Sequence, residues 1–115
     1  MSTFTVVTQQ HPDRAVITVC GEMDLQTCPE LAQAASVIAL DGKPLYLDLS
    51  GVSFMDSSGL NVLLLLHQRL HGEGSRLAIT GLQPQPARLL QMTGAYSLFS
   101  ADAPPLAGPD AALTV

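Results

Sequence analysis

The sequence predicts one domain of mixed α/β fold, in the order β-β-α-β-α-β-α-β, with an antiparallel N-terminal edge and helices mainly on one face. Segments with strand-like alternation and segments with helical periodicity follow one another, and such βαβ units form parallel sheets with right-handed crossovers. Residues 45–49 alternate strictly, so three leucines share one face while Tyr46 and Asp48 share the other. A strand covered by helices on both faces would be apolar on both. Helices are therefore expected mainly on the leucine side.

The N-terminal half is predicted to form a hairpin followed by a helix. Residues 4–8 and 15–20 are rich in β-forming side chains and are separated by a polar loop, which is typical of an antiparallel pair. A helix is expected after Thr27, because Thr27 and Glu30 match a capping box in which Glu30 reaches back to the backbone. An apolar stripe then follows helical spacing at Leu31, Ala34, Ala35 and Ile38. Residues 41–44 are expected to end this helix.

The C-terminal half continues the alternation of helices and strands. The expected elements are a short connection (residues 50–55), an apolar helix (60–70), a strand (77–80), a short helix (87–93) and a final edge strand (Leu98 and Phe99). Gly94 is expected to end the short helix, because glycine favours the left-handed conformation found there. Residues 1–100 then form the domain, and residues 101–115, rich in Ala, Pro and Gly, form a loosely held tail.

Composition and charge exclude several kinds of partner. The chain has 115 residues with ten acidic and five basic side chains, a net charge of −5. The basic side chains are scattered, whereas a nucleic-acid surface needs clustered Lys and Arg, so no nucleic-acid partner is expected. The longest unbroken apolar run, residues 62–66, is far shorter than the roughly 18 residues that span a bilayer. Since the N-terminus lacks the pattern of a signal peptide, a cytoplasmic protein without a membrane partner is expected.

The cysteines and histidines do not match a metal-binding pattern. Cys20 and Cys28 lie outside any Cys-x-x-Cys motif, so both are expected to be reduced and mostly buried thiols. His67 and His71 have a spacing that can hold a metal on a helix, but the His-Glu-x-x-His pattern is missing, which favours an exposed polar face. Met92 is expected in the core. No metal or other cofactor is predicted.

Residues 54–60 (Phe-Met-Asp-Ser-Ser-Gly-Leu) are the most informative stretch. Asp56, Ser57 and Ser58 lie where a strand-to-helix loop enters a helix, and open α/β sheets bind ligands at this edge. Either Asp56 or Ser57 is expected to cap the helix, since a cap needs a single side chain. A helix N-terminus also favours an anion. The spacing is therefore compatible both with a helix cap and with a functional site.

Four segments together resemble the STAS domain, and among its members the anti-sigma-factor antagonists of bacteria. They are residues 21–24 (Gly-Glu-Met-Asp), 47–52 (Leu-Asp-Leu-Ser-Gly-Val), 54–60 and 89–94 (Leu-Leu-Gln-Met-Thr-Gly). The resemblance extends from about Thr3 to Phe99. The chain departs from the family pattern at Asn61, where many relatives have Gly. It is also expected to lack the family's fourth helix, which the Ala/Pro/Gly-rich tail replaces.

The resemblance implies a regulatory binding module rather than an enzyme. In this family, the serine that follows the Asp, here Ser57, is phosphorylated by a partner that is both an anti-sigma factor and an ATP-dependent serine kinase. The unmodified antagonist binds that partner and frees a sigma factor, and a serine/threonine phosphatase reverses the modification. The implied partner-binding residues are Asp24, Met55, Asp56, Ser57, Ser58 and Gly59. Asp24 is expected on the same rim as Ser57, and Met55 is expected to be an exposed docking residue.

Two other classes of function compete with a switched antagonist. A non-switching STAS scaffold or transport-accessory protein would use Ser57 only as a helix cap. An enzyme or nucleotide hydrolase would need a Lys-bearing phosphate loop or a Gly-x-Ser-x-Gly elbow, and the sequence contains neither. The row of short polar side chains at residues 56–58 favours the switched antagonist.

Overall fold

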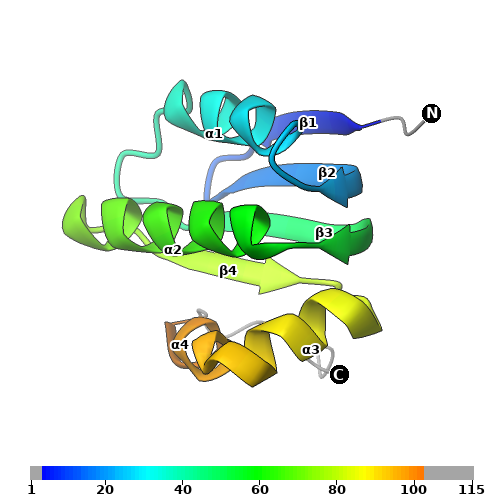
Figure 1. Cartoon of the computed structure of the whole chain (residues 1–115). Helices are drawn as coiled ribbons and strands as arrows, with labels where there is room; N and C mark the ends of the chain where they lie inside the picture. The colour runs from blue at the N-terminus through cyan, green and yellow to red at the C-terminus, as the bar shows by residue number, and fades with distance from the viewer. Residues whose placement is uncertain (1–3, 103–115) are drawn as a thin grey trace.

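The computed structural model describes residues 4–102 and contains a four-stranded sheet with four helices (Figure 1). The strands are β1 (Thr5–Gln10), β2 (Ala15–Met23), β3 (Leu45–Met55) and β4 (Leu77–Thr80). The helices are α1 (Cys28–Ser36), α2 (Ser57–Gly72), α3 (Pro84–Thr93) and α4 (Ala95–Asp102). The predicted tail, from residue 103 onward, lies outside the described residues.

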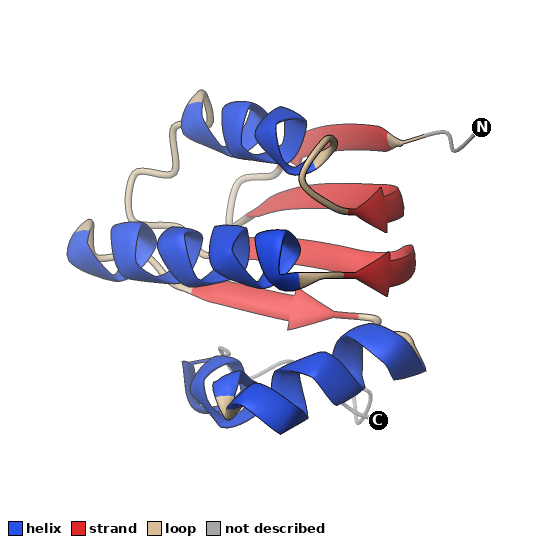
Figure 2. Cartoon of the chain, in the orientation of Figure 1, coloured by secondary structure: helices blue, strands red, loops and turns tan. Residues whose placement is uncertain are grey.

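The sheet is mixed, as the sequence predicts. Its strand order is β1-β2-β3-β4, with β1 antiparallel to β2 and the other two pairs parallel. Figure 2 shows α1 and α2 on the same face of this sheet, while α3 and α4 lie beside β4. Helices on one face are what the alternation in residues 45–49 indicates, and this part of the fold prediction is confirmed.

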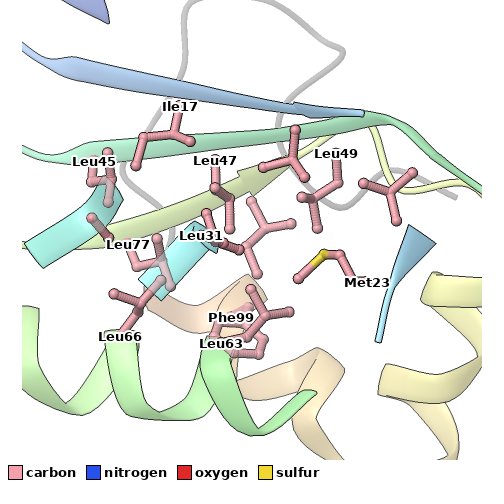
Figure 3. Packing of buried hydrophobic residues seen from close by; sticks show 14 of the residues in the cluster. Ile17, Met23, Leu31, Leu45, Leu47, Leu49, Leu63, Leu66, Leu77 and Phe99 are labelled. Carbon is pink, nitrogen blue, oxygen red and sulfur yellow. The ribbon is translucent and has the colours of Figure 1, made fainter. Parts of the chain in front are cut away.

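The core lies between the sheet and its helices (Figure 3). Leu45, Leu47 and Leu49 are buried on the helix side of β3, whereas Tyr46 and Asp48 are partly exposed on the other side. Helices α1 and α2 contribute the facing apolar side chains, which include Leu31, Leu63, Leu66 and Leu70. Met92 does not join this core: its side chain is 77% exposed, so that expectation is wrong, and its neighbour Leu90 is buried on α3 instead.

Strand β3 is longer than predicted. Residues 50–55, expected as a connection, continue the strand and pair with β2 as far as Met55, which lies opposite Met23. The pairing shifts register twice along β2, and Gly51 lies at the first shift. A Cβ on Gly51 would lie 2.5 Å from the Cys20 Sγ, so a larger residue here would require the Cys20 side chain to move.

The start of α1 differs from the predicted capping box. Thr27 does precede the helix, but its backbone is already helical and its side chain makes no cap hydrogen bond. Instead, the Thr27 hydroxyl donates to the Glu22 carbonyl at 2.6 Å and accepts from the Asp24 N–H at 2.9 Å. The hydroxyl is therefore committed to the preceding turn, and Glu30 is exposed. The helix also ends earlier than expected, at Ser36.

The predicted final strand at Leu98 and Phe99 is wrong, because these residues belong to α4. Gly94 ends α3 as predicted, with a φ of 81°, and the chain starts α4 at the next residue. Ala95 and Phe99 lie one helical turn apart and are both buried. The rings of Phe99 and His67 form a T-shaped pair with centroids 5.7 Å apart. Packing of this helical face overrides the β-propensity of Leu98 and Phe99. The expectation that a fourth helix is missing is therefore also wrong.

Candidate functional site

The candidate site lies at the edge of the sheet where β2 and β3 end and α2 begins. The Asp56 N–H donates to the Met23 carbonyl at 3.1 Å, which joins the start of α2 to the end of β2. Asp24 follows Met23 directly, so Asp24 and Asp56 leave neighbouring strand ends at the same edge. We call this edge, with Asp24, Leu25 and residues 54–59, the acidic rim. The structure therefore places Asp24 at the same edge of the sheet as the start of α2.

Asp56 is the N-cap of α2. Its backbone is extended, and its Oδ1 accepts hydrogen bonds from the Ser58 N–H at 2.8 Å and the Gly59 N–H at 3.4 Å. These are two of the amide groups that the first turn of a helix leaves without intrahelical partners. The capping role that the sequence leaves open between Asp56 and Ser57 therefore belongs to Asp56.

Ser57 is the first residue of α2 and its side chain is exposed. Within residues 4–102, no group makes a hydrogen bond with the Ser57 hydroxyl. This hydroxyl does not serve as the helix cap, because the Asp56 carboxylate provides it. Ser58 is partly buried one position further into the helix. The arrangement presents one serine hydroxyl to solvent at a helix N-terminus, beside a carboxylate.

Asp24 is held by the loop that it starts. Its Oδ1 accepts from the Gln26 N–H at 2.9 Å and the Thr27 N–H at 3.0 Å. These bonds form an Asx-type turn between β2 and α1. The turn presents Leu25, whose side chain is 75% exposed, on the acidic rim.

Met55 does not have the exposed position that was expected. Its side chain is fully buried beside Met23 and under Gly59. A Cβ on Gly59 would lie 2.6 Å from the Met55 Cγ, so helix α2 packs directly on this methionine. The expectation treated residues 50–55 as a loop, whereas β3 continues to Met55 and turns this side chain inward. The neighbouring Phe54 is on the outer side and is 41% exposed.

Leu25 and Phe54 are apolar rim residues that the sequence reasoning missed. Leu25 could have been found, because a large apolar residue between the polar residues Asp24 and Gln26 has little to pack against. Phe54 could not, since its orientation depends on the strand continuing past the register shifts.

A groove of about 230 Å³ lies between the first turns of α1 and α2, next to the acidic rim. Its lining residues are Leu25, Cys28, Pro29, Ala32, Ser58, Asn61 and Val62. Most of these side chains are apolar. The groove therefore extends the rim with a surface that suits apolar side chains of a partner more than a charged ligand.

The thiols of Cys20 and Cys28 differ in burial, and only Cys28 lies near the acidic rim. Cys28 is buried, and burial raises its pKa to about 11, with smaller contributions from the carboxylates of Asp56 and Asp24. This thiol therefore stays protonated at neutral pH. Cys20 is exposed on β2, so the expectation of two mostly buried thiols holds for Cys28 alone.

Metal and membrane features are not found in the described part of the chain. Across residues 4–102, no group of three or more His, Cys, Asp or Glu side chains is arranged to hold a metal ion. His67 and His71 stack with ring centroids 6.0 Å apart. None of the four helices described is long and apolar enough to cross a membrane.

Comparison with known proteins identifies the family. A family model described as "Mlab, STAS domain" matches residues 6–99, and the chain therefore belongs to the STAS family. An anti-sigma-B factor antagonist of Listeria monocytogenes is 35% identical over 89 residues, which cover 76% of this chain and 78% of the relative.

Solved structures agree with this assignment. An anti-sigma factor antagonist from Mycobacterium paratuberculosis has a TM-score of 0.71 and 31% identity, over 84% of this chain and 83% of that chain. The unphosphorylated form of the anti-sigma factor antagonist SpoIIAA shares the fold, with a TM-score of 0.66 and 22% identity, over 81% of this chain and 82% of that chain.

Proposed function

We propose that this chain is an anti-sigma-factor antagonist that is switched by phosphorylation of Ser57. In the unmodified state it binds an anti-sigma factor with serine kinase activity, and the sigma factor is released. Phosphorylation of Ser57 by that partner ends the complex, and a serine/threonine phosphatase restores the unmodified form. The chain then acts as a regulatory binding protein of the cytoplasm rather than as an enzyme.

The exposed Ser57 hydroxyl is the observation that supports this proposal most directly. Because Asp56 caps α2, the Ser57 side chain is not needed to hold the helix start. A non-switching scaffold in which Ser57 serves as the cap is therefore less well supported. The names of the relatives that are 31% and 35% identical favour the same function.

The acidic rim supplies a surface for the partner. Leu25 and Phe54 offer exposed apolar side chains, and Asp24, Asp56, Ser57 and Ser58 supply the polar part, whereas the implied partner residue Gly59 is buried against Met55. Met55 contributes from below by supporting Gly59, not by direct contact. Apolar anchors surrounded by polar groups are typical of specific protein interfaces.

A phosphate on Ser57 would change this surface more than the fold. A phosphoserine carries about −1.5 to −2 charges at pH 7. The helix N-terminus favours an anion by about 0.3–1 kcal/mol, which offsets part of the repulsion from Asp56. A partner surface that fits a neutral hydroxyl, by contrast, meets a desolvated dianion beside two carboxylates. The domain stays folded and the complex weakens.

Capture from a lysate of the source bacterium, followed by incubation with ATP, tests the proposal. The expected result is a captured protein that transfers one phosphate to Ser57, with no transfer to Ser57→Ala and normal transfer to Ser58→Ala. If the chain captures only transporter subunits, or a partner that transfers no phosphate, the scaffold or transport-accessory function replaces the antagonist.

A matched pair of variants tests the docking surface. Leu25 on the acidic rim and Val37 at the other end of α1 are 75% and 77% exposed. Leu25→Ser is expected to weaken binding of the captured partner about tenfold or more, as an interface anchor does. Val37→Ser is expected to bind like the unchanged chain. Equal binding by both variants would place the interface elsewhere.

A further inference from the structure

Strand β3 is paired on its β4 side over only part of its length. The β3–β4 ladder runs from Leu45 opposite Leu77 to Asp48 opposite Thr80, and β4 ends there. β3 continues for residues 49–55, up to the acidic rim. On this side, the start of α3 follows the end of β4 (Figure 1). Backbone groups along this part of β3 need partners that a strand does not provide.

Two glutamine side chains from the start of α3 provide these partners. Gln83 Nε2 donates to the Ser50 carbonyl at 2.7 Å. Gln85 makes a paired contact with a single residue: its Oε1 accepts from the Met55 N–H at 2.8 Å, and its Nε2 donates to the Met55 carbonyl at 3.0 Å. The Gln85 amide thus pairs with Met55, the last residue of β3, in the way that the backbone of a neighbouring strand would.

The contact with Gln85 also fixes the first peptide unit of residues 55–57, which join β3 to α2 and which we call the acceptor loop. The Met55 carbonyl and the Asp56 N–H belong to the same planar unit. Gln85 holds its carbonyl from the α3 side, and the Met23 carbonyl holds its N–H from the β2 side at 3.1 Å. With both ends held, this unit cannot rotate. Its orientation sets the direction of Asp56, which caps α2 through Ser58 and Gly59.

We infer that Gln85 is a positioning residue for the phosphoryl acceptor Ser57. This inference rests on the proposed function, since it concerns the rate at which Ser57 accepts a phosphate. Without Gln85, the Met55–Asp56 peptide unit is held from one side only, and the backbone that carries Ser57 is placed less firmly. Misplacement of a reacting group by about 1 Å can lower a rate about a hundredfold. Docking of the partner on Leu25, which lies on the turn between β2 and α1, does not depend on this contact.

The chain offers matched variants for the test. Gln85→Met keeps the length of the side chain but removes both hydrogen bonds to Met55. Gln85→Glu keeps an acceptor for the Met55 N–H and loses the donor to the Met55 carbonyl. Gln83→Met is the control, because it removes a bond of the same kind to Ser50, away from the acceptor loop.

Amide hydrogen exchange of the full chain tests the positioning itself and needs no kinase. In Gln85→Met, the Met55, Asp56 and Ser58 amides are expected to exchange at least about tenfold faster than in the unchanged chain, with amides of β4 unaffected. In Gln83→Met, the exchange rates of these three amides are expected to stay within about twofold of those in the unchanged chain. Unchanged exchange in Gln85→Met, or equal acceleration by both variants, would overturn the inference.

Phosphate transfer by the captured kinase with ATP gives the second test. Gln85→Met is expected to lower kcat about tenfold at an unchanged KM for the antagonist, with an intermediate effect for Gln85→Glu and none for Gln83→Met. Equal kcat for Gln85→Met and the unchanged chain would overturn the positioning role. If the unchanged chain takes no phosphate at all, the proposed function fails, and the exchange measurement alone decides whether Gln85 holds the Met55–Asp56 peptide.

Discussion

At the residue scale, Asp56 rather than Ser57 caps α2, which leaves the Ser57 hydroxyl available as the candidate phosphate acceptor. Its carboxylate bonds to the Ser58 and Gly59 amides at 2.8 and 3.4 Å, so its removal leaves two first-turn amides without this partner. Asp56→Ala is expected to lower the free energy of unfolding by about 1 kcal/mol. Asp56→Asn is expected to keep most of this stabilisation, because asparagine also caps helices. Urea unfolding monitored by circular dichroism measures both. Equal stability of Asp56→Ala and the unchanged chain would show that the cap contributes nothing.

The Cys28 thiol predicts a pH dependence of stability. Its pKa in the folded chain is about 11, raised from 9.0 chiefly by burial, so the folded state holds this proton more tightly than the unfolded state does. The Cys28 contribution is therefore complete below about pH 9 and is lost as the pH rises toward about 11.

Denaturant unfolding between pH 8 and 11 measures this contribution. The unchanged chain is expected to lose more stability over this range than Cys28→Ala does, and the difference isolates the thiol from other groups. Cys20→Ala is the matched control for loss of a thiol outside the core, because Cys20 is exposed. If the free energy of unfolding falls with pH equally in Cys28→Ala and in the unchanged chain, the burial of an uncharged Cys28 thiol is contradicted.

At the element scale, helix α2 is seated on the strand ends through Gly59. A Cβ there would lie 2.6 Å from the Met55 Cγ and 3.1 Å from the Met23 Cβ. Gly59→Ala is expected to destabilise the domain by about 1–3 kcal/mol, because the helix start must move away from the sheet. Gly72 ends the same helix with open space around it, so Gly72→Ala is expected to be neutral or slightly stabilising. Thermal unfolding of the two variants measures the contrast, and equal effects would contradict this packing.

Some helix and strand bounds could be predicted from local sequence signals, and others could not. Strand β4 has the predicted bounds, 77–80, and α3 ends at Gly94, because an apolar β-forming run and a left-handed glycine are strong local signals. The capping box at Thr27 failed since two nearby groups, the Glu22 carbonyl and the Asp24 N–H, compete for the same hydroxyl. Local sequence does not reveal that competition.

The candidate site could be predicted in part. The position of Asp24 and the helix start at residues 56–59 follow from local motifs and from the rule that parallel strands end at one edge. The burial of Met55 and the exposure of Phe54 depend on β3 continuing along β2, which is a tertiary property. The contact between Gln85 and Met55 spans 30 residues, and neither residue shows a motif for it.

At the scale of the whole molecule, two truncations test where the domain ends. The sequence after Asp102 contains Pro104, Pro105, Gly108 and Pro109, which do not propagate a helix, and a chain that ends at Asp102 is expected to melt within a few degrees of the full chain. A chain that ends at Gly94 loses α4 with the buried Phe99, a loss of about 3–5 kcal/mol if it resembles removal of a core Phe side chain.

Differential scanning calorimetry of both truncations measures the boundary. A collapse of the transition for the chain that ends at Asp102 would show that residues 103–115 belong to the folded domain. An unchanged transition for the chain that ends at Gly94 would contradict the packing of α4 on the core.

The affinity of the captured anti-sigma factor for the unmodified chain and for the chain phosphorylated at Ser57 tests the switch most directly. Isothermal titration calorimetry is expected to give about a hundredfold weaker binding after phosphorylation, which corresponds to about 2.8 kcal/mol. The circular dichroism spectrum is expected to stay the same, and Ser57→Asp to bind weakly while Ser57→Ala binds constitutively. Equal affinity for the two forms, or a phosphate that maps to Ser58, would contradict the assignment of Ser57 as the switch.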